Sequence, residues 1–391
     1  MLDRLIRPRL EQTKKSILLL GPRQVGKSTL CRSLGPDRII NLADEENFIS
    51  YAKDPGRLRR ETLALKGAQV VFIDEIQRVP ALLNTVQALL DERPGLRFLL
   101  TGSSARKLKR GGANLLPGRI VLEHLDPLTF WEMGNSFRLD DCLTTGCLPG
   151  IRHERESDIL RVLESYAQIY LREEIQAEAL VRNIGAYARF LDTAADASGD
   201  WINYSKLSSD MELPKETVRR FLEILEETLI VFRIPAFREK ESRRRLTQRD
   251  RFVFFDPGVR NALLGTHNHV LSSTEKGKLF EQWILLQCLY YARANGKAWR
   301  LSSYRTDAGA EVDIVLDTGS RFVAIECKAG KTIPAGSFRG ARSFEQVVQK
   351  PLEKIILYTG SSIQRFGPRE NAVPYADFLR EWLPVSEEGF S

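Results

Sequence analysis

The stretch Gly21-Pro-Arg-Gln-Val-Gly-Lys-Ser-Thr29 follows directly on the apolar run Ser16–Leu20 and decides the fold of the first part of the chain. Its spacing is G-x-x-x-x-G-K-[ST], in which backbone N–H groups curl around phosphate oxygens. Lys27 is expected to reach the β and γ phosphates, and the Ser28 hydroxyl to bind Mg²⁺. The predicted nucleotide contacts are Gly21, Pro22, Arg23, Gln24, Val25, Gly26, Lys27, Ser28 and Thr29.

A second apolar run, Val70–Asp74, is followed by Glu75 and is typical of a central parallel strand buried on both faces. An acid at the end of such a strand can hold Mg²⁺ through water, so we assign Asp74 to the nucleotide and metal site. The adjacent Glu75 is the predicted catalytic base, since a carboxylate can polarise the attacking water. The alternative is a pair of solvated acids at a strand end.

A third apolar run, Leu96–Leu100, ends in small hydroxyl residues at what is expected to be the same edge of the sheet. Thr101 or Ser103 is predicted to sense the γ-phosphate, and we assign Ser103 to the nucleotide site; capping of the next helix is the alternative. Residues 103–122 then carry five basic side chains and no acid. Arg119 in this stretch is either an arginine finger that stabilises transition-state charge or a structural ion-pair partner.

The segments GPRQVGKST, VVFIDEIQ, FLLTGSS and LLPGRIVLEHLDPLTFWEM resemble the core of the AAA+ ATPases. More narrowly, they are similar to a prokaryotic family in which this core precedes a domain of unknown function related to PD-(D/E)xK nucleases. The resemblance implies ATP and Mg²⁺ as cofactors. It also implies a homo-oligomer, such as a ring, because AAA+ sites are completed by the neighbouring subunit.

Residues 201–237 predict a short helix (Ser205–Met211), a turn, a helix from Pro214 to Glu227 and an apolar strand. This order resembles winged-helix domains. Residues 233–251 hold eight basic residues against three acids, a pattern that favours sequence-independent contact with a DNA backbone. A solvated basic hairpin that mediates domain contacts is the alternative. The predicted DNA contacts are Arg238, Lys240, Arg243, Arg244, Arg245 and Arg249.

The last part of the chain predicts a helix after Gly277 and then a hairpin of two strands, Glu311–Leu316 and Arg321–Lys328. Period-two alternation places Glu326 and Lys328 on one face, opposite Asp313 on the partner strand. Two converging carboxylates suit Mg²⁺, so Asp313 and Glu326 are predicted metal ligands.

Together with Glu281 on the helix, Asp313, Glu326 and Lys328 resemble the nuclease pattern, which implies that these four residues are catalytic. The alternative is a set of salt-bridged charges on a solvated sheet face.

Composition limits the class of protein. The chain has 391 residues, 43% of them hydrophobic and 28% charged, and its 58 basic against 51 acidic side chains give a net charge of +7. These values are typical of a folded globular protein with a mild preference for polyanions. The apolar runs are far shorter than the ~20 residues of a membrane span, and the start has no signal-peptide core. We therefore expect a cytoplasmic protein without a membrane span.

We predict an α/β protein in four parts: an AAA+ P-loop core (1–135), a helical lid or connector (136–190), a winged helix (191–265) and a PD-(D/E)xK nuclease-like domain (266–391). The predicted function is an oligomeric ATPase that couples Mg²⁺-dependent ATP hydrolysis to DNA binding or remodelling. One alternative is an ATP-dependent DNA nuclease that uses Asp313, Glu326 and Lys328. The other is a nucleotide-controlled protein-interaction switch.

Overall fold

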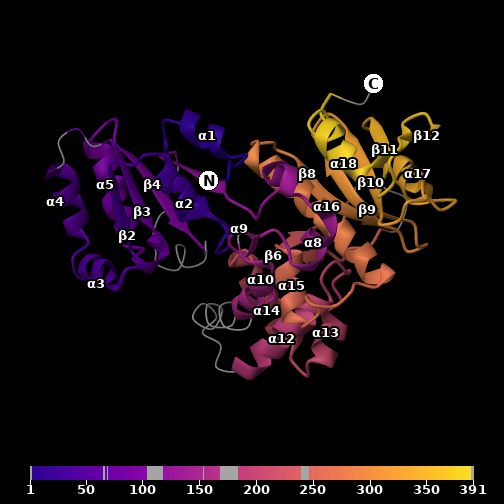
Figure 1. The fold of residues 1–391 in the computed structure, drawn as a ribbon, viewed down its shortest axis with the longest axis horizontal. Helices are drawn as coiled ribbons and strands as arrows, with labels where there is room; N and C mark the ends of the chain where they lie inside the picture. The colour runs from indigo at the N-terminus through magenta and orange to yellow at the C-terminus, as the bar shows by residue number, and fades with distance from the viewer. Residues whose placement is uncertain are drawn as a thin grey trace.

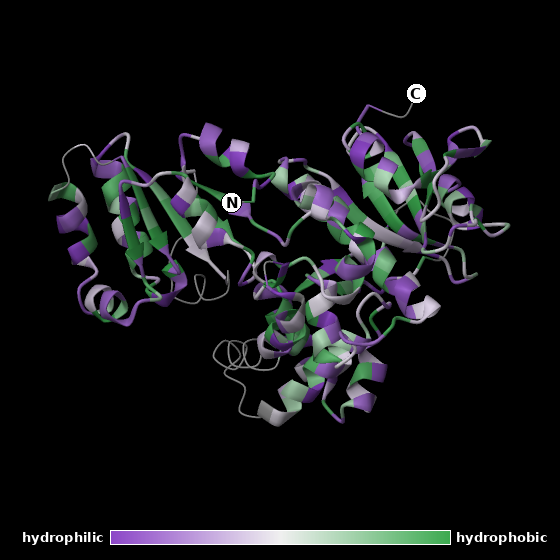
Figure 2. Cartoon of the chain, in the orientation of Figure 1, coloured by the Kyte–Doolittle hydropathy of each residue, from purple (hydrophilic) through white to green (hydrophobic). Residues whose placement is uncertain are grey.

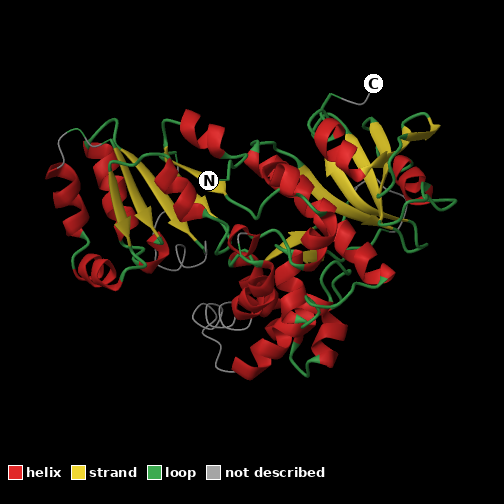
Figure 3. Ribbon diagram, in the orientation of Figure 1, coloured by secondary structure: helices red, strands yellow, loops and turns green. Residues whose placement is uncertain are grey.

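The computed structural model describes residues 2–64, 67, 69–103, 118–152, 154–167, 184–238 and 246–388. The chain forms an amino-terminal unit, a helical middle unit and a carboxyl-terminal unit (Figures 1 and 3). Of the predicted DNA contacts, Lys240, Arg243, Arg244 and Arg245 lie outside the described residues.

The amino-terminal unit is built on a five-stranded parallel sheet. Its strands are β1 (Ser16–Leu20), β2 (Arg38–Asn41), β3 (Val70–Asp74), β4 (Arg97–Gly102) and β5 (Ile120–His124), in the order β2-β3-β4-β1-β5. Its helices are α1 (Arg7–Gln12), α2 (Lys27–Ser33), α3 (Glu45–Lys53), α4 (Gly56–Ala64), η1 (Ile76–Arg78) and α5 (Leu82–Glu92). The buried strands β1, β3 and β4 confirm the three predicted apolar runs, and their carboxyl ends meet at one edge of the sheet.

The middle unit is helical and carries one small hairpin. Its elements are α7 (Phe130–Met133), η2 (Gly134–Ser136), α8 (Leu139–Thr144), α9 (Pro149–Arg152), α10 (Glu156–Ser165), α12 (Ile184–Asp196), α13 (Tyr204–Asp210), α14 (Lys215–Glu227), β6 (Val231–Ile234), β7 (Arg251–Phe254) and α15 (Pro257–Leu263). The helices α13 and α14 and the strand β6 stand where helix, turn, helix and strand are predicted. The strands β6 and β7 pair antiparallel.

The carboxyl-terminal unit packs the long helix α16 (Ser273–Ala294) against a six-stranded sheet of order β12-β13-β11-β10-β9-β8. Its further elements are β8 (Arg300–Arg305), β9 (Glu311–Asp317), β10 (Phe322–Lys328), α17 (Arg339–Glu345), β11 (Leu352–Tyr358), β12 (Gln364–Gly367), β13 (Glu370–Pro374), α18 (Tyr375–Asp377) and η4 (Phe378–Trp382). The predicted hairpin is confirmed, because β9 and β10 pair antiparallel.

The start of α16 differs from the prediction. The helix begins at Ser273, because Ser272 and Glu275 form a capping box in which each side chain accepts from the other residue's backbone N–H. Gly277 therefore lies inside the helix, at a position where a Cβ would have open space around it.

The units are joined by an apolar cluster. This cluster of buried side chains reaches from Ile6 to Leu383, and smaller buried clusters lie apart from it within the amino- and carboxyl-terminal units. Figure 2 shows that the strands of both large sheets are mostly hydrophobic. Polar contacts join the carboxyl end of α16 to the segment after β5, where Arg293 pairs with Asp126 at 3.0 Å. None of the helices formed by the described residues combines the length and the apolar character that a membrane crossing requires.

Candidate functional site

The phosphate loop lies between β1 and α2 and is tightly packed against the chain after β5. A Cβ on Gly21 would lie 2.1 Å from the carbonyl oxygen of Leu125, so only glycine fits there. Gln24 and Gly26 have φ values of 60° and 92°, the left-handed region that turns the backbone N–H groups inward. The Lys27 ammonium donates to the carbonyl oxygens of Gly21 and Pro22, at 2.8 and 2.7 Å.

Two hydroxyls and a carboxylate meet at the edge of the sheet beside this loop. Ser28 Oγ lies 2.8 Å from Asp74 Oδ1, and Thr101 Oγ1 donates to the same oxygen at 2.5 Å. The topology explains the grouping, because β4 lies between β1 and β3 and carries Thr101 to the level of Asp74. Hydroxyl and carboxylate oxygens are ligands that Mg²⁺ prefers, so Ser28 and Asp74 are the residues that would hold a magnesium ion here.

The predicted base Glu75 lines the same cavity and is held from several sides. Its φ of 58° is unusual for a residue other than glycine, and its backbone N–H donates to Thr101 Oγ1 at 3.1 Å. The Gln77 amide donates both to the Glu75 carboxylate and to Ser103 Oγ, the latter at 3.1 Å. The predicted nucleotide contact Ser103 therefore binds Gln77. It is not one of the described residues that line the cavity.

The cavity over the loop has a volume of about 520 Å³. Besides loop residues and Glu75 it is lined by Leu2 and Arg4 before β1 and by Pro149 and Gly150 at the start of α9. The middle unit therefore closes one side of this cavity. A volume of this size is in the usual range for small-molecule sites.

Arg4 is a residue that the sequence analysis missed. Its buried guanidinium donates to the carbonyl oxygens of Val25 in the loop and Asp126 after β5, both at 2.6 Å, and pairs with Glu132 at 2.9 Å. The side chain thereby connects the loop to the segment that leads into the middle unit. Its sequence context, one of three arginines in the first nine residues, offers no signal for this role.

Arg119 stands at the opposite edge of the sheet from the loop. It precedes Ile120, which pairs with the first residue of β1, whereas the loop follows the last residue of that strand. Its guanidinium pairs with Asp91 on α5 at 2.6 Å. Within its own subunit Arg119 does not reach the cavity, so a role in hydrolysis would require a neighbouring subunit.

The basic residues of the strands β6 and β7 and of the chain between them (residues 235–250, the hairpin connection) have different environments. Arg238 is exposed and lies 3.4 Å from Asp250, and Arg249 is exposed and lines a cavity. Arg233 pairs with Glu226 at 3.0 Å, and Arg251, the first residue of β7, is buried. Arg251 points into the protein, so not all of the eight basic residues counted between 233 and 251 contribute to the surface.

Both ends of this connection are attached to the carboxyl-terminal sheet. The N–H of Phe237 donates to Ser303 O at 2.8 Å and the N–H of Thr247 to Arg305 O at 3.0 Å, so the connection pairs with the edge strand β8. The ring of Phe237 packs edge-on against Phe344. The hairpin thus docks on the carboxyl-terminal unit.

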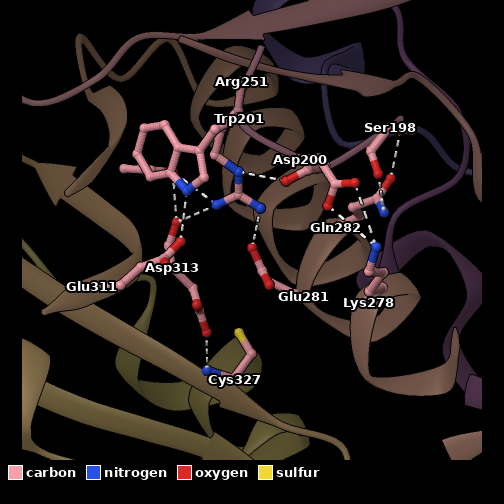
Figure 4. Close-up of polar contacts among 12 residues, drawn as sticks. Ser198, Asp200, Trp201, Arg251, Lys278, Glu281, Gln282, Glu311, Asp313 and Cys327 are labelled. Atoms are coloured by element: carbon pink, nitrogen blue, oxygen red, sulfur yellow. Dashed lines mark hydrogen bonds and ion pairs between the residues drawn. The ribbon is translucent and has the colours of Figure 1, made fainter. Parts of the chain in front are cut away.

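The predicted acidic cluster is brought together by α16, β9 and β10 (Figure 4). Asp313 Oδ2 accepts from the N–H of Cys327 at 2.8 Å, Lys328 pairs with Glu326 at 2.7 Å, and Glu281 pairs with Arg251. Burial, with the charges of Glu281 and Glu326, holds the pKa of Asp313 well above its ordinary value.

Two further pKa values in the cluster are shifted. Burial raises the pKa of Glu326, against the opposing effect of Lys328. Burial alone would lower the pKa of Arg251, but the charges of Glu281, Asp313 and Glu311 together raise it. Throughout the described part of the chain, no group of three or more His, Cys, Asp or Glu side chains is arranged to hold a metal ion.

Comparison with family models divides the chain in the same way as the fold. Residues 13–134 match the model of an AAA domain, residues 136–270 a domain of unknown function (DUF8612) and residues 276–378 a domain of unknown function (DUF4143). The first match supports an AAA-type ATPase family for the unit that carries the phosphate loop.

Sequence relatives cover most of the chain. An uncharacterized protein of Mycobacterium tuberculosis is 28% identical over 322 residues, which are 81% of this chain and 70% of that protein. An uncharacterized protein of Haemophilus influenzae is 24% identical over 277 residues, 63% of this chain and 69% of that protein.

Solved structures resemble the chain only loosely. A STAND-class signal transduction ATPase with a tetratricopeptide repeat sensor from Pyrococcus horikoshii matches with a TM-score of 0.26 and 14% identity. The match covers 74% of this chain and 46% of that protein, so the chain spans less than half of its length. The replication initiator DnaA bound to AMPPCP and single-stranded DNA matches with a TM-score of 0.26 and 14% identity over 57% of this chain and 86% of that one. No functional conclusion follows from scores this low.

Proposed function

We propose that this chain is an ATPase that hydrolyses ATP with Mg²⁺ and couples the turnover to the binding or remodelling of DNA. The observation that carries the ATPase part is the convergence of Ser28, Asp74 and Glu75 on one edge of the parallel sheet, beside the loop that holds Lys27.

The residues have distinct parts in this proposal. Lys27 and the loop N–H groups hold the β and γ phosphates, and Ser28 and Asp74 hold the metal. Bound Mg²⁺ neutralises charge on the phosphate oxygens. Glu75 accepts the proton of the attacking water, and its strained backbone with the amide of Gln77 keeps its carboxylate over the loop.

The DNA part rests on a groove between the hairpin connection and the edge of the carboxyl-terminal sheet. We call it the Trp201 groove; its volume is about 630 Å³, and its lining is Trp201, Leu246, Thr247, Gln248, Arg249, Arg305, Thr306, Asp307 and Gly309. Arg249 and Arg305 are exposed enough to meet phosphates, and an indole offers a surface on which a base can stack.

A second cavity, of about 380 Å³, adjoins the Trp201 groove at Gly309 and contains Lys328 and Arg339. The basic run Arg243–Arg245 directly precedes the groove residues in the sequence. The described cations of the two cavities, Arg249, Arg305, Lys328 and Arg339, suit contact with a phosphate backbone, and such contacts carry no sequence information.

The test measures the ATPase rate and DNA affinity of the full chain with duplex, single-stranded and branched DNA. We expect Lys27→Ala to abolish turnover, and DNA to change the wild-type rate. Arg249→Ala should weaken binding about equally for all sequences and lower the slope of log affinity against log salt by about 1. Arg59→Ala, an exposed arginine on α4 paired with Glu92, is the matched control.

The outcomes separate the two parts of the proposal. Turnover that survives Lys27→Ala would contradict the ATPase assignment. Turnover that depends on Lys27, with no DNA binding even at low salt, would contradict the DNA assignment and leave the ATPase in place.

A further inference from the structure

Arg251, the first residue of β7, is the centre of the buried polar cluster in Figure 4. Its side chain is 4% exposed and its guanidinium reaches into the carboxyl-terminal unit. It donates to Ser303 Oγ at 3.0 Å and to the carbonyl oxygen of Asp313 at 3.1 Å, and it forms an ion pair with Glu281. Its Nε–H donates back to the middle unit, to Gly199 O at 2.7 Å.

The carboxyl-terminal sheet is shaped to admit this side chain. The register of β8 against β9 shifts between Ser302 and Tyr304, where Ser303 alone stands opposite two residues of β9, Asp313 and Ile314. Ser303 donates its N–H to Pro235 O at 3.1 Å and its hydroxyl to Asp313 O at 2.7 Å. Ser303 Oγ and the carbonyl oxygen of Asp313 therefore lie together and both accept from the guanidinium.

Trp201 covers the guanidinium from another side. Its ring centroid lies 5.7 Å from the Arg251 Cζ, within the range of a cation–π interaction. Its indole N–H donates to Glu311 Oε1 at 2.8 Å, so the ring also belongs to the joint between the middle and carboxyl-terminal units.

The three acidic side chains of the predicted nuclease pattern each have a partner within the protein. Glu281 is paired with Arg251, Asp313 Oδ2 accepts from a backbone N–H, and Glu326 is paired with Lys328. The nuclease resemblance implies Mg²⁺ at this point, but the residues do not fit it. A guanidinium stays charged at every accessible pH, and a divalent cation beside it would be repelled.

We propose that Arg251 takes the place of the divalent cation in this cluster, so that Glu281 and Asp313 form a docking joint for the hairpin and not a site of cleavage. The proposal implies that DNA held near the Trp201 groove is not cut. For the presence of DNA it rests on the proposed function, which it deepens. The placement of Arg251 in the cluster is independent of DNA, because it concerns whether Arg251 or a divalent cation lies between the Glu281 carboxylate and Asp313.

Binding of Mn²⁺ to the full chain, followed by electron paramagnetic resonance, tests the proposal. All proteins carry Asp74→Asn to remove the predicted metal ligand at the nucleotide site. We expect no Mn²⁺ bound at the carboxyl-terminal cluster, so that Asp313→Asn changes nothing. We expect Arg251→Met to gain one Mn²⁺ with a Kd at least tenfold lower than that of its parent, and Asp313→Asn to abolish this gain.

Every outcome bears on the proposal. Mn²⁺ binding by the Arg251-containing parent that Asp313→Asn removes would overturn it, as would Mg²⁺-dependent DNA cleavage lost in Asp313→Asn. A folded Arg251→Met protein that gains no Mn²⁺ would overturn the claim that Arg251 excludes the metal. The comparison of the parent with Asp313→Asn holds even where Arg251→Met does not fold, and none of the Mn²⁺ measurements requires DNA binding.

The joint itself is tested by a double-mutant cycle on thermal stability. Arg251→Met and Glu281→Gln each leave a buried polar partner unpaired and should each lower Tm, whereas the double variant should lower it by less than the sum. Additive effects would contradict a direct coupling between the two side chains. Arg293→Met with Asp126→Asn, the ion pair at the other end of α16, provides a matched cycle.

Discussion

The guanidinium of Arg4 donates to the carbonyl oxygen of Val25 at 2.6 Å, so a side chain that precedes the sheet holds the phosphate loop from behind. The same side chain donates to Asp126 O and pairs with Glu132. We expect Arg4→Met to weaken ATP binding roughly tenfold, since a buried charge-assisted hydrogen bond contributes about 1.5–3 kcal/mol. Isothermal titration with a non-hydrolysable ATP analogue measures the effect.

Arg7→Met is the control for Arg4, because Arg7 is partly exposed on α1 and pairs with Glu11. Equal losses in both variants would mean that the basic start acts through overall charge and not through the loop.

Gln77 is expected to act as a positioning residue for Glu75. Its amide is the link between the Glu75 carboxylate and Ser103 Oγ. Gln77→Leu should lower kcat by roughly 10- to 100-fold, about 1.4–2.7 kcal/mol in the barrier, and leave nucleotide affinity unchanged. The kcat and the analogue Kd are measured on the same preparation, with Gln87→Leu on α5 as control. A change in affinity without a change in kcat would contradict the assignment.

Arg119 can contribute to hydrolysis only across a subunit boundary, because in its own chain it pairs with Asp91 at the far edge of the sheet. We expect Arg119→Ala and Glu75→Gln each to be inactive alone. Mixed oligomers of the two should regain turnover, since some sites then combine an intact Glu75 with an intact Arg119 from the neighbour. Full activity of Arg119→Ala alone would identify Arg119 as a structural partner of Asp91.

We expect the side chain of Phe237 to stabilise the packing of the hairpin connection against the carboxyl-terminal sheet. Its ring packs edge-on against Phe344 and Phe322, with centroids 4.8 and 5.7 Å away. We expect Phe237→Ala to cost about 2 kcal/mol of folding free energy, less than the ~3–5 kcal/mol of a fully buried phenylalanine, because Phe237 is only partly buried.

The loss at Phe237 is measured by denaturant unfolding together with limited proteolysis after residue 237. Phe366→Ala, a phenylalanine that is 50% exposed, is the control. Faster proteolysis in Phe366→Ala than in Phe237→Ala would contradict the docking role.

We expect Asp256 to make the stability of the middle unit dependent on pH. The side chain is fully buried, caps α15 and accepts from the N–H of Cys147 at 2.6 Å, and burial raises its pKa from 3.8 to about 6. Well below pH 3.8 the carboxyl is protonated in the folded and the unfolded chain alike. Between about pH 4 and 6 it ionises first in the unfolded chain, so its contribution to stability falls as the pH rises.

The contribution of Asp256 that is lost across this window is on the order of 3 kcal/mol, at about 1.4 kcal/mol per pH unit. Asp256→Asn does not titrate, so the stability of the wild type relative to this variant should fall from pH 4 to pH 6 and then stay constant. Urea unfolding at several pH values measures the difference. A difference that rises with pH would contradict the assignment.

Most secondary structure around the nucleotide loop follows from local sequence. The apolar runs at β1, β3 and β4 are long enough and apolar enough to predict buried parallel strands. The spacing of glycine, lysine and serine between residues 21 and 28 predicts the phosphate loop. In the carboxyl-terminal unit the prediction found β9 and β10 but not β8, β12 or β13. Strand β12 is mostly exposed and β13 contains a glutamate and a proline, so neither has the alternation that marks a strand.

The sequence by itself determined the phosphate loop, the two acids after β3 and the order of helix and strands that carries Glu281, Asp313 and Glu326, because each of these depends on spacing within a short segment. Only the tertiary structure decided the partners of those side chains. Arg4 and Arg251 are unremarkable in the sequence, yet each is buried against groups far along the chain. A guanidinium selects its partners by burial and by the directions of its N–H groups, and neither is a property of the local sequence.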